Sequence, residues 1–219
     1  MKTVHAFCIG LMMLISFGMP VTAAEQHSAA SSTEILQRLI DGNKRYIDAK
    51  ATHPDQSSQR RTELAQGQHP FAVIVCCSDS RLPPEIIFDQ GLGDLFVIRL
   101  AGNVLDDAAL GSIEYAVEHL GVKLVMVLGH ERCGAVEATI KGGEAPGHIG
   151  SLVKAIQPAV DKVKNQPGDL TDNVVRENIN MVVQQVKSSE PILSELTKSG
   201  AVSVIGARYD LDDGVVEIK

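Results

Sequence analysis

Residues 71–81 read FAVIVCCSDSR, and this stretch decides the fold. The first six residues, 71–76, form a continuous apolar run. Such a run is typical of a strand buried on both faces, which occurs mainly in parallel sheets covered by helices. Cys77 follows the run, at the carboxyl end of the predicted strand, where open α/β sheets place their ligand sites. The stretch therefore predicts a central strand with a functional site at its end.

The segments on either side of this strand alternate between strand and helix patterns. Further strands are expected at 94–100, 123–128, 201–208 and 215–218, with a hairpin turn at 212–214. Helices are expected at 33–50, 108–120, 151–164, 171–189 and 191–199, with a short one at 59–65. This alternation predicts an α/β fold, a mainly parallel β-sheet flanked by helices, in a single domain over residues 33–219.

The first 24 residues have the features of a secretory signal. Lys2 supplies a positive charge, residues 6–19 are almost wholly apolar, and small residues follow. We expect cleavage after Ala23 or Ala24, and a flexible polar tether at 25–32. The mature protein is then expected to be periplasmic or secreted. An uncleaved membrane anchor is the alternative, although the apolar run is short for a bilayer.

The composition excludes one class of partner. The chain has 219 residues, 44% of them hydrophobic, and a net charge of −7. This negative charge, and the lack of a basic patch with interleaved aromatic residues, argue against nucleic acid binding. No membrane contact is expected once the signal is removed.

Cys77, His130 and Cys133 offer three ligands for a zinc ion. His130 and Cys133 belong to the run GHERCG at 129–134, which follows the apolar strand at 123–128. Parallel strands end at the same edge of a sheet, so the two motifs should lie close together. Thiolates and imidazole together suit zinc, and three protein ligands leave one position open, as in catalytic sites. We therefore predict one zinc per chain, with His130 and Cys133 on one face of a helical turn.

Other interpretations of these residues remain open. In an oxidising compartment Cys77 and Cys133 could instead form a disulfide. Asp79 could itself complete the zinc shell and close the site. Cys76 should point to the opposite face of its strand from Cys77, as a small buried hydrophobe.

Asp79 and Arg81 lie directly beside the first ligand. A guanidinium binds a carboxylate through two hydrogen bonds and keeps it as an acceptor. If Arg81 holds Asp79 in this way, the fourth zinc position is left for water. A surface salt bridge without a catalytic role is the alternative.

The two motifs together resemble the signature of the β-class carbonic anhydrases, and the similarity runs from about Gln68 to Val136. This resemblance implies reversible hydration of CO2 to bicarbonate and a proton, at a zinc ion held by Cys77, His130 and Cys133. It also implies that Asp79 and Arg81 form a catalytic dyad that orients the attacking water.

The same resemblance implies five substrate-binding residues. The side-chain amide of Gln68 and the backbone N–H of Gly134 would donate to the substrate. Phe96, Ala101 and Tyr115 would line an apolar CO2 cleft, partly across a dimer interface. Without the resemblance, Phe96 and Tyr115 would be interpreted almost equally well as ordinary core residues, and Arg99 and Asn103 are interpreted as scaffold.

The resemblance has two further consequences. It implies a dimer or tetramer, in which the N-terminal helical arm packs on a neighbouring subunit; the apolar stripe of that arm is Ile35, Leu36, Leu39, Ile40 and Ile47. It also favours the open-site subgroup, because Ile74 stands where members that close the zinc with the dyad aspartate carry a tryptophan. Arg99 and Tyr209 could match the rest of that inhibitory bicarbonate pocket.

Two rival functions follow from the same residues. One is hydrolysis of carbonyl sulfide or carbon disulfide, which are linear analogues of CO2. The other is a non-catalytic protein in which zinc is a structural staple. A staple would need neither Asp79 and Arg81 nor Gln68, so these residues argue against it.

Overall fold

The computed structural model describes residues 30–219, so the predicted signal and most of the tether lie outside the described residues. The core is a five-stranded sheet in the order β2-β1-β3-β4-β5. Four strands are parallel and β5 is antiparallel to β4. The strands are β1 (Ala72–Cys76), β2 (Leu95–Arg99), β3 (Leu124–His130), β4 (Ser203–Tyr209) and β5 (Val216–Ile218). The predicted α/β fold with a mainly parallel sheet is confirmed.

The strand at the centre of the prediction lies between two parallel neighbours. β1 pairs with β2 on one side and β3 on the other. Every residue of β1 and β3 is buried. Helices cover both faces of these strands, which explains why their sequences are continuously apolar instead of alternating.

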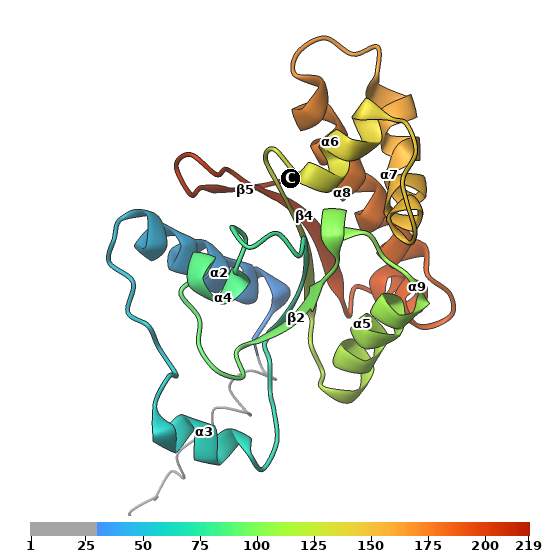
Figure 1. The fold of residues 1–219 in the computed structure, drawn as a ribbon. Coiled ribbons are helices and arrows are strands. Elements are labelled where there is room, and N and C mark those ends of the chain that lie inside the picture. The colour runs from blue at the N-terminus through green and yellow to red at the C-terminus, as the bar shows by residue number, and fades with distance from the viewer. Residues whose placement is uncertain (1–29) are drawn as a thin grey trace, which may run out of the picture.

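Helices flank the sheet on both sides. Figure 1 shows α2 and α4 on one side, α5 to α9 on the other, and α3 away from the sheet. Their bounds are α2 (Ser32–Ile47), α3 (Ser58–Leu64), α4 (Pro84–Ile87), α5 (Asp107–His119), α6 (Gly134–Lys141), α7 (Ile149–Val163), α8 (Leu170–Ser188) and α9 (Ile192–Lys198). A 3-10 turn, η1, spans Ala101–Asn103. Within residues 30–219, no helix has the length and apolar character needed to cross a membrane.

The N-terminal helix α2 begins earlier and ends earlier than predicted. Ser31 is its N-cap, and a reciprocal hydrogen bond with Glu34 completes a capping box. Ile35 and Leu39 are buried in this chain's own core, so this half of the stripe needs no neighbouring subunit. Ile40 and Ile47 are 39% and 40% exposed. Packing of the arm on another subunit stays a prediction for the exposed half.

The second ligand motif adopts a different local structure from the predicted helical turn. His130 is the last residue of β3, and Cys133 is the N-cap of α6. Arg132, between them, has a positive φ of 46°, which a right-handed helix excludes. The prediction of one helical turn is therefore wrong, and α6 itself was not predicted.

Candidate metal centre

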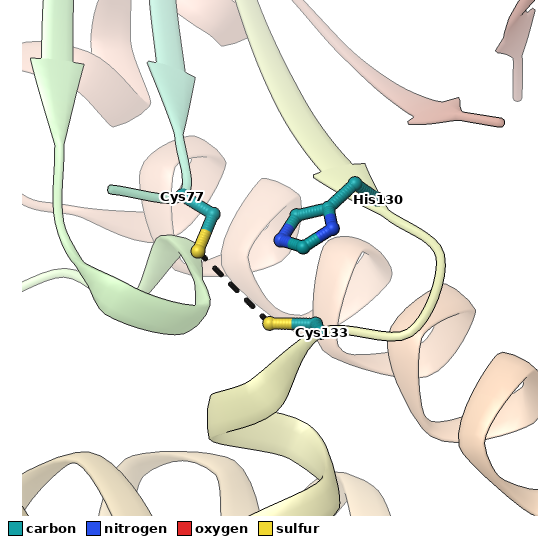
Figure 2. Close-up of side chains that lie close together, drawn as sticks. All are labelled: Cys77, His130 and Cys133. Carbon is teal, nitrogen blue, oxygen red and sulfur yellow. Dashed lines mark hydrogen bonds between the residues drawn. The ribbon is translucent and has the colours of Figure 1, made fainter. Parts of the chain in front are cut away.

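Three elements bring the predicted ligands together at the carboxyl edge of the sheet. Cys77 directly follows β1, His130 ends β3 and Cys133 caps α6, as Figure 2 shows. Their ligand atoms lie within 4.8 Å of one another, and all three residues are buried. The adjacency expected from two parallel strand ends is therefore observed.

The donor atoms fit a zinc ion. Nδ1 of His130 lies 2.7 Å from the carbonyl oxygen of Glu131, so Nδ1 donates and Nε2 keeps its lone pair. Nε2 is buried and has no hydrogen-bond partner within residues 30–219. Such a buried orphan acceptor is costly unless another group satisfies it. The sulfurs of Cys77 and Cys133 are 4.0 Å apart, close to the roughly 3.8 Å that a tetrahedral zinc with 2.3 Å bonds requires.

The two sulfurs are in contact with each other, 4.0 Å apart. The contact with Cys133 and the hydrogen bond from the Gly102 N–H outweigh burial and lower the pKa of Cys77 below its usual range. The same contact, together with burial, holds the pKa of Cys133 far above its usual range. Both cysteines are free, so the alternative of a disulfide is not adopted in this structure. Cys76 is also buried, and burial raises the pKa of its thiol to about 12.

A backbone group in η1 supports the Cys77 sulfur. The N–H of Gly102 in η1 donates to Cys77 Sγ over 3.2 Å. Gly102 has a φ of +70°, and a Cβ there would lie 2.7 Å from the Ile156 side chain, so glycine is required. Ala101 precedes it in η1. Gly134 begins α6 immediately after Cys133. The structure therefore places these two predicted substrate-binding residues next to the ligands.

Asp79 and Arg81 form the predicted bidentate pair. Arg81 Nε donates to Oδ1 of Asp79 over 2.9 Å, and Nη2 donates to Oδ2 over 2.8 Å. These bonds, with one from the Arg81 N–H, hold the pKa of Asp79 well below its usual range. Oδ2 also lies 3.7 Å from His130 Nε2, so the carboxylate borders the ligand set. Arg81 further donates to the carbonyl oxygen of Arg132, which ties the two motifs together.

Arg99 has the scaffold role predicted for it, whereas the scaffold role of Asn103 stays a prediction. The Arg99 guanidinium donates to the carbonyl oxygens of Cys77 and Asp79, over 3.2 and 2.6 Å. It therefore fixes the backbone of the loop that carries the first ligand and the dyad. Asn103 is buried in η1.

Three predicted substrate-binding residues lie away from the ligands of their own chain. Gln68 precedes the amino end of β1, whereas Cys77 follows its carboxyl end. The five strand residues advance the chain by roughly 17 Å, more than the roughly 14 Å that residues 68–71 could span in return. Phe96 pairs with Val73, near the amino ends of their strands.

Tyr115 lies on α5, beside Phe96 rather than beside the ligands. The ring centroids of these two residues are 6.4 Å apart, and Tyr115 is 47% exposed. One chain alone therefore leaves Gln68, Phe96 and Tyr115 without access to the ligand set. The interpretation of Tyr115 as ordinary core is wrong.

Two residues near the centre were not found from the sequence. Gly102 supplies the donor to Cys77 Sγ, and its positive φ is not visible in a short motif. Glu131 fixes the tautomer of His130 through its carbonyl oxygen. Its position inside GHERCG was a signal, but the partner of its side chain lies 77 residues away.

Comparison with known proteins agrees with these motifs. A family model described as carbonic anhydrase matches residues 72–216. A carbonic anhydrase of Mycolicibacterium smegmatis is 41% identical over 185 residues, 83% of this chain and 90% of that protein. Carbonic anhydrase 2 of Mycobacterium tuberculosis is 43% identical over 180 residues, 80% of this chain and 87% of that protein. A solved β-carbonic anhydrase of Coccomyxa, in complex with acetazolamide, is 27% identical with a TM-score of 0.67, over 87% of this chain and 86% of that one.

Proposed function

This chain belongs to the β-class carbonic anhydrases, and on that premise we propose that it hydrates CO2 reversibly with one zinc ion held by Cys77, His130 and Cys133. The observation that carries the proposal is the buried Nε2 of His130, which has no hydrogen-bond partner within the described residues and faces two sulfurs 4.0 Å apart. Zinc, when bound, supplies a Lewis acid that lowers the pKa of water at its open position.

Asp79 orients the attacking water. Both of its oxygens accept hydrogen bonds from Arg81, and its depressed pKa keeps the carboxylate ionised at neutral pH. It can therefore only accept a hydrogen bond from the water, which directs an oxygen lone pair toward CO2. Arg81 holds that acceptor in place and, through the carbonyl of Arg132, keeps it in register with the second motif.

The amino end of α6 stabilises the developing anion. Gly134 is the first residue of α6, so its N–H has no partner inside the helix. The positive end of the helix dipole points the same way and favours a bicarbonate oxygen there. Ala101 begins η1, and by the family resemblance it would add apolar surface to the site.

A second copy of the chain completes the substrate cleft. Gln68 is exposed, and Tyr115 forms a partly exposed aromatic patch with Phe96 and His119, with ring centroids 6.4 and 5.3 Å apart. We place the Gln68 amide and the aromatic patch of one subunit beside the ligand set of the other, where they complete its substrate cleft. In a two-fold dimer each contact occurs twice, so both sites are completed in the same way. The assembly is thus a homodimer or a tetramer built from it.

We further assign the chain to the open-site subgroup. Both oxygens of Asp79 accept hydrogen bonds from Arg81, which supports an aspartate that does not coordinate the metal. The residues of the inhibitory bicarbonate pocket are engaged elsewhere: Tyr209 is hydrogen-bonded to Tyr46, and Arg99 donates to backbone carbonyls. A steep, cooperative rise of activity with pH, together with inhibition by bicarbonate, would contradict this assignment.

The decisive experiment is stopped-flow CO2 hydration on the zinc-loaded full chain, with carbonyl sulfide and carbon disulfide as competing substrates. Asp79→Asn should hold a full zinc complement and lose most of its activity. Cys133→Ala should lose zinc. A wild-type chain that binds zinc and hydrates no CO2 would leave zinc as a structural staple. Full activity of Asp79→Asn would remove Asp79 from the mechanism.

Mixing two inactive variants tests the shared cleft. Gln68→Ala subunits keep an intact ligand set, and Cys133→Ala subunits keep Gln68. Mixed dimers should therefore regain one complete site in two, while each parent stays impaired. Absence of recovery in dimers shown to be mixed would place the Gln68 contact within one chain or remove it.

The proposed location follows from the sequence of the first 24 residues. We propose export to the periplasm or secretion, with removal of the signal after Ala23 or Ala24. Amino-terminal sequencing of the mature protein from a fractionated cell checks this. A chain that retains residues 1–24 in the cytosolic fraction would contradict it.

A further inference from the structure

A network of charged side chains lies beside the metal centre and has no role in the mechanism above. Its central residue is Arg208, next to the end of β4, whose side chain is 9% exposed. Arg208 Nη2 donates to Glu131 Oε1 over 2.6 Å, and Nε donates to Asp172 Oδ1 over 2.6 Å. Nη1 reaches Asp210 Oδ2 at 3.3 Å. One buried guanidinium therefore joins β4, α8 and the turn between the second and third ligands.

Glu131 occupies that turn and is held at four atoms. Its N–H donates to the Tyr209 carbonyl over 3.1 Å, and its carbonyl oxygen accepts from His130 Nδ1 over 2.7 Å. Its carboxylate accepts from Arg208 through Oε1 and from the Leu211 N–H, over 3.1 Å, through Oε2. The side chain thus ties the turn to residues 208–211, while the backbone orients the imidazole.

The segment that receives Glu131 is itself fixed from the opposite side. The Asn43 side-chain amide donates to the Gly214 carbonyl over 2.9 Å, and its oxygen accepts from the Val216 N–H over 3.0 Å. Asn43 is 5% exposed, on α2. The connection between β4 and β5 is therefore anchored to α2 by two hydrogen bonds.

We propose that Glu131 and Arg208 are positioning residues for the metal centre, an inference that rests on the zinc site proposed above. The Glu131–Arg208 ion pair holds the peptide whose carbonyl keeps His130 in the Nδ1–H tautomer, with Nε2 toward the sulfurs. Outer-shell partners of this kind typically set metal affinity by roughly ten- to hundredfold. Loss of the pair removes a side-chain anchor of the turn between His130 and Cys133. We therefore expect the positions of these ligands to become less fixed while the sheet stays folded.

Zinc release into a chelator tests this on the full, zinc-loaded chain. Arg208→Met should release zinc roughly ten to a hundred times faster than the unchanged chain. Arg176→Met is the matched control, because Arg176 also pairs with Asp172, and with Glu217, but does not touch the turn. Equal release rates from the two arginine variants would overturn the proposal.

Two substitutions of Glu131 guard against a folding defect in Arg208→Met. Glu131→Gln keeps the volume and one acceptor oxygen, so zinc release should be intermediate. Glu131→Ala should release zinc as fast as Arg208→Met. Release from Glu131→Ala at the rate of the unchanged chain would show that the side chain does not position the turn.

Hydrogen exchange on the metal-free chain separates this inference from the proposed function. In Arg208→Met the amide of Glu131, which donates to the Tyr209 carbonyl, should lose protection, while the amides of β3 keep it and Arg176→Met stays unchanged. Loss of protection spread evenly over the sheet would mean a merely structural ion pair and would overturn the inference. A wild-type chain that takes up no zinc would refute the proposed function, and this comparison would still decide the role of Glu131 and Arg208.

Discussion

Two aspartate–arginine pairs in this chain have different roles, one at the metal centre and one between two helices. Asp79 and Arg81 are two residues apart, and their carboxylate borders the ligand set, 3.7 Å from His130 Nε2. Asp89 and Arg45 are 44 residues apart, and the Asp89 side chain is 1% exposed. The first pair lies at the carboxyl edge of the sheet, whereas the second joins α2 to the end of α4.

The surroundings of each carboxylate explain the difference. Asp89 accepts from Arg45, from the N–H and hydroxyl of Thr52, and from the N–H of His53. Its oxygens are thus used by a guanidinium and by backbone and hydroxyl groups that it holds in place. Asp79 also faces Arg81, but its remaining direction points to a group that can hold a metal. Both carboxylates pair with an arginine, so the partner does not distinguish them. The Asp79 pair is functional because its carboxylate also borders the metal ligands.

Removal of the dyad arginine should produce the largest effect. Arg81→Ala should reduce CO2 hydration by roughly a hundredfold, since Asp79 loses the group that holds it in place. Stability should change by less than about 1 kcal/mol, because the Arg81 side chain is half exposed. Stopped-flow assays, zinc analysis and thermal unfolding of the same preparation measure the activity, the zinc content and the stability. Near-normal turnover would reduce the pair to a salt bridge.

Removal of Asp89 should reduce the stability of the protein and leave its activity unchanged. Asp89→Asn keeps the shape and tolerates the positive φ of 46° at this residue, but it loses the charge. Burial alone would raise the pKa of Asp89, but bonds from Thr52, Arg45 and His53 outweigh it and lower the pKa to about 2.

The lowered pKa sets the size of the expected effect. We expect a loss of about 2 kcal/mol in the free energy of unfolding at neutral pH, since one pKa unit corresponds to about 1.4 kcal/mol. Urea unfolding measures this, with the exposed Asp41→Asn as control. Turnover per folded molecule should be unchanged; a specific defect in turnover would contradict the structural role.

Acid should erase the difference between the wild type and Asp89→Asn. The pKa of Asp89 is lower in the folded chain, about 2, than its ordinary value of 3.8. The stabilisation it contributes is therefore complete above about pH 4 and is lost as the pH falls through 2. Unfolding free energies of the two proteins should converge over that window. A constant gap down to about pH 2 would show that the charge of Asp89 is not responsible.

The smallest effect should come from a conservative change in the second pair. Arg45→Lys keeps the charge but loses the second donor that reaches the Asp89 carbonyl. We expect a loss of about 1 kcal/mol or less, because the Arg45 side chain is one-third exposed and partly screened. The corresponding Arg81→Lys should cost more in activity than in stability. If Arg45→Lys and Arg81→Lys lost the same activity and the same stability, the two pairs would not differ in role.

Local patterns predicted much of the site. Cys77 and the dyad lie within five residues, and their position after a buried strand was sufficient to place them at the sheet edge. The helix α6 was missed because its eight residues follow the ligand motif directly, and Arg132 breaks the backbone between strand and helix. The expected helical turn for His130 and Cys133 failed for the same reason.

The sequence by itself determined the central strand, the ligand types and the local Asp79–Arg81 pair, because each depends on residues that are close along the chain. Only the tertiary structure decided that Arg208 meets Glu131 and that Gln68 lies at the far end of β1 from Cys77. These relations depend on strand order and strand length, since parallel strands bring distant residues together at one edge and carry neighbouring residues to opposite ends. The spacing of residues close along the chain indicates the metal-ligand types and the helix and strand patterns. The contacts that support the metal centre arise from packing among β3, β4 and α8.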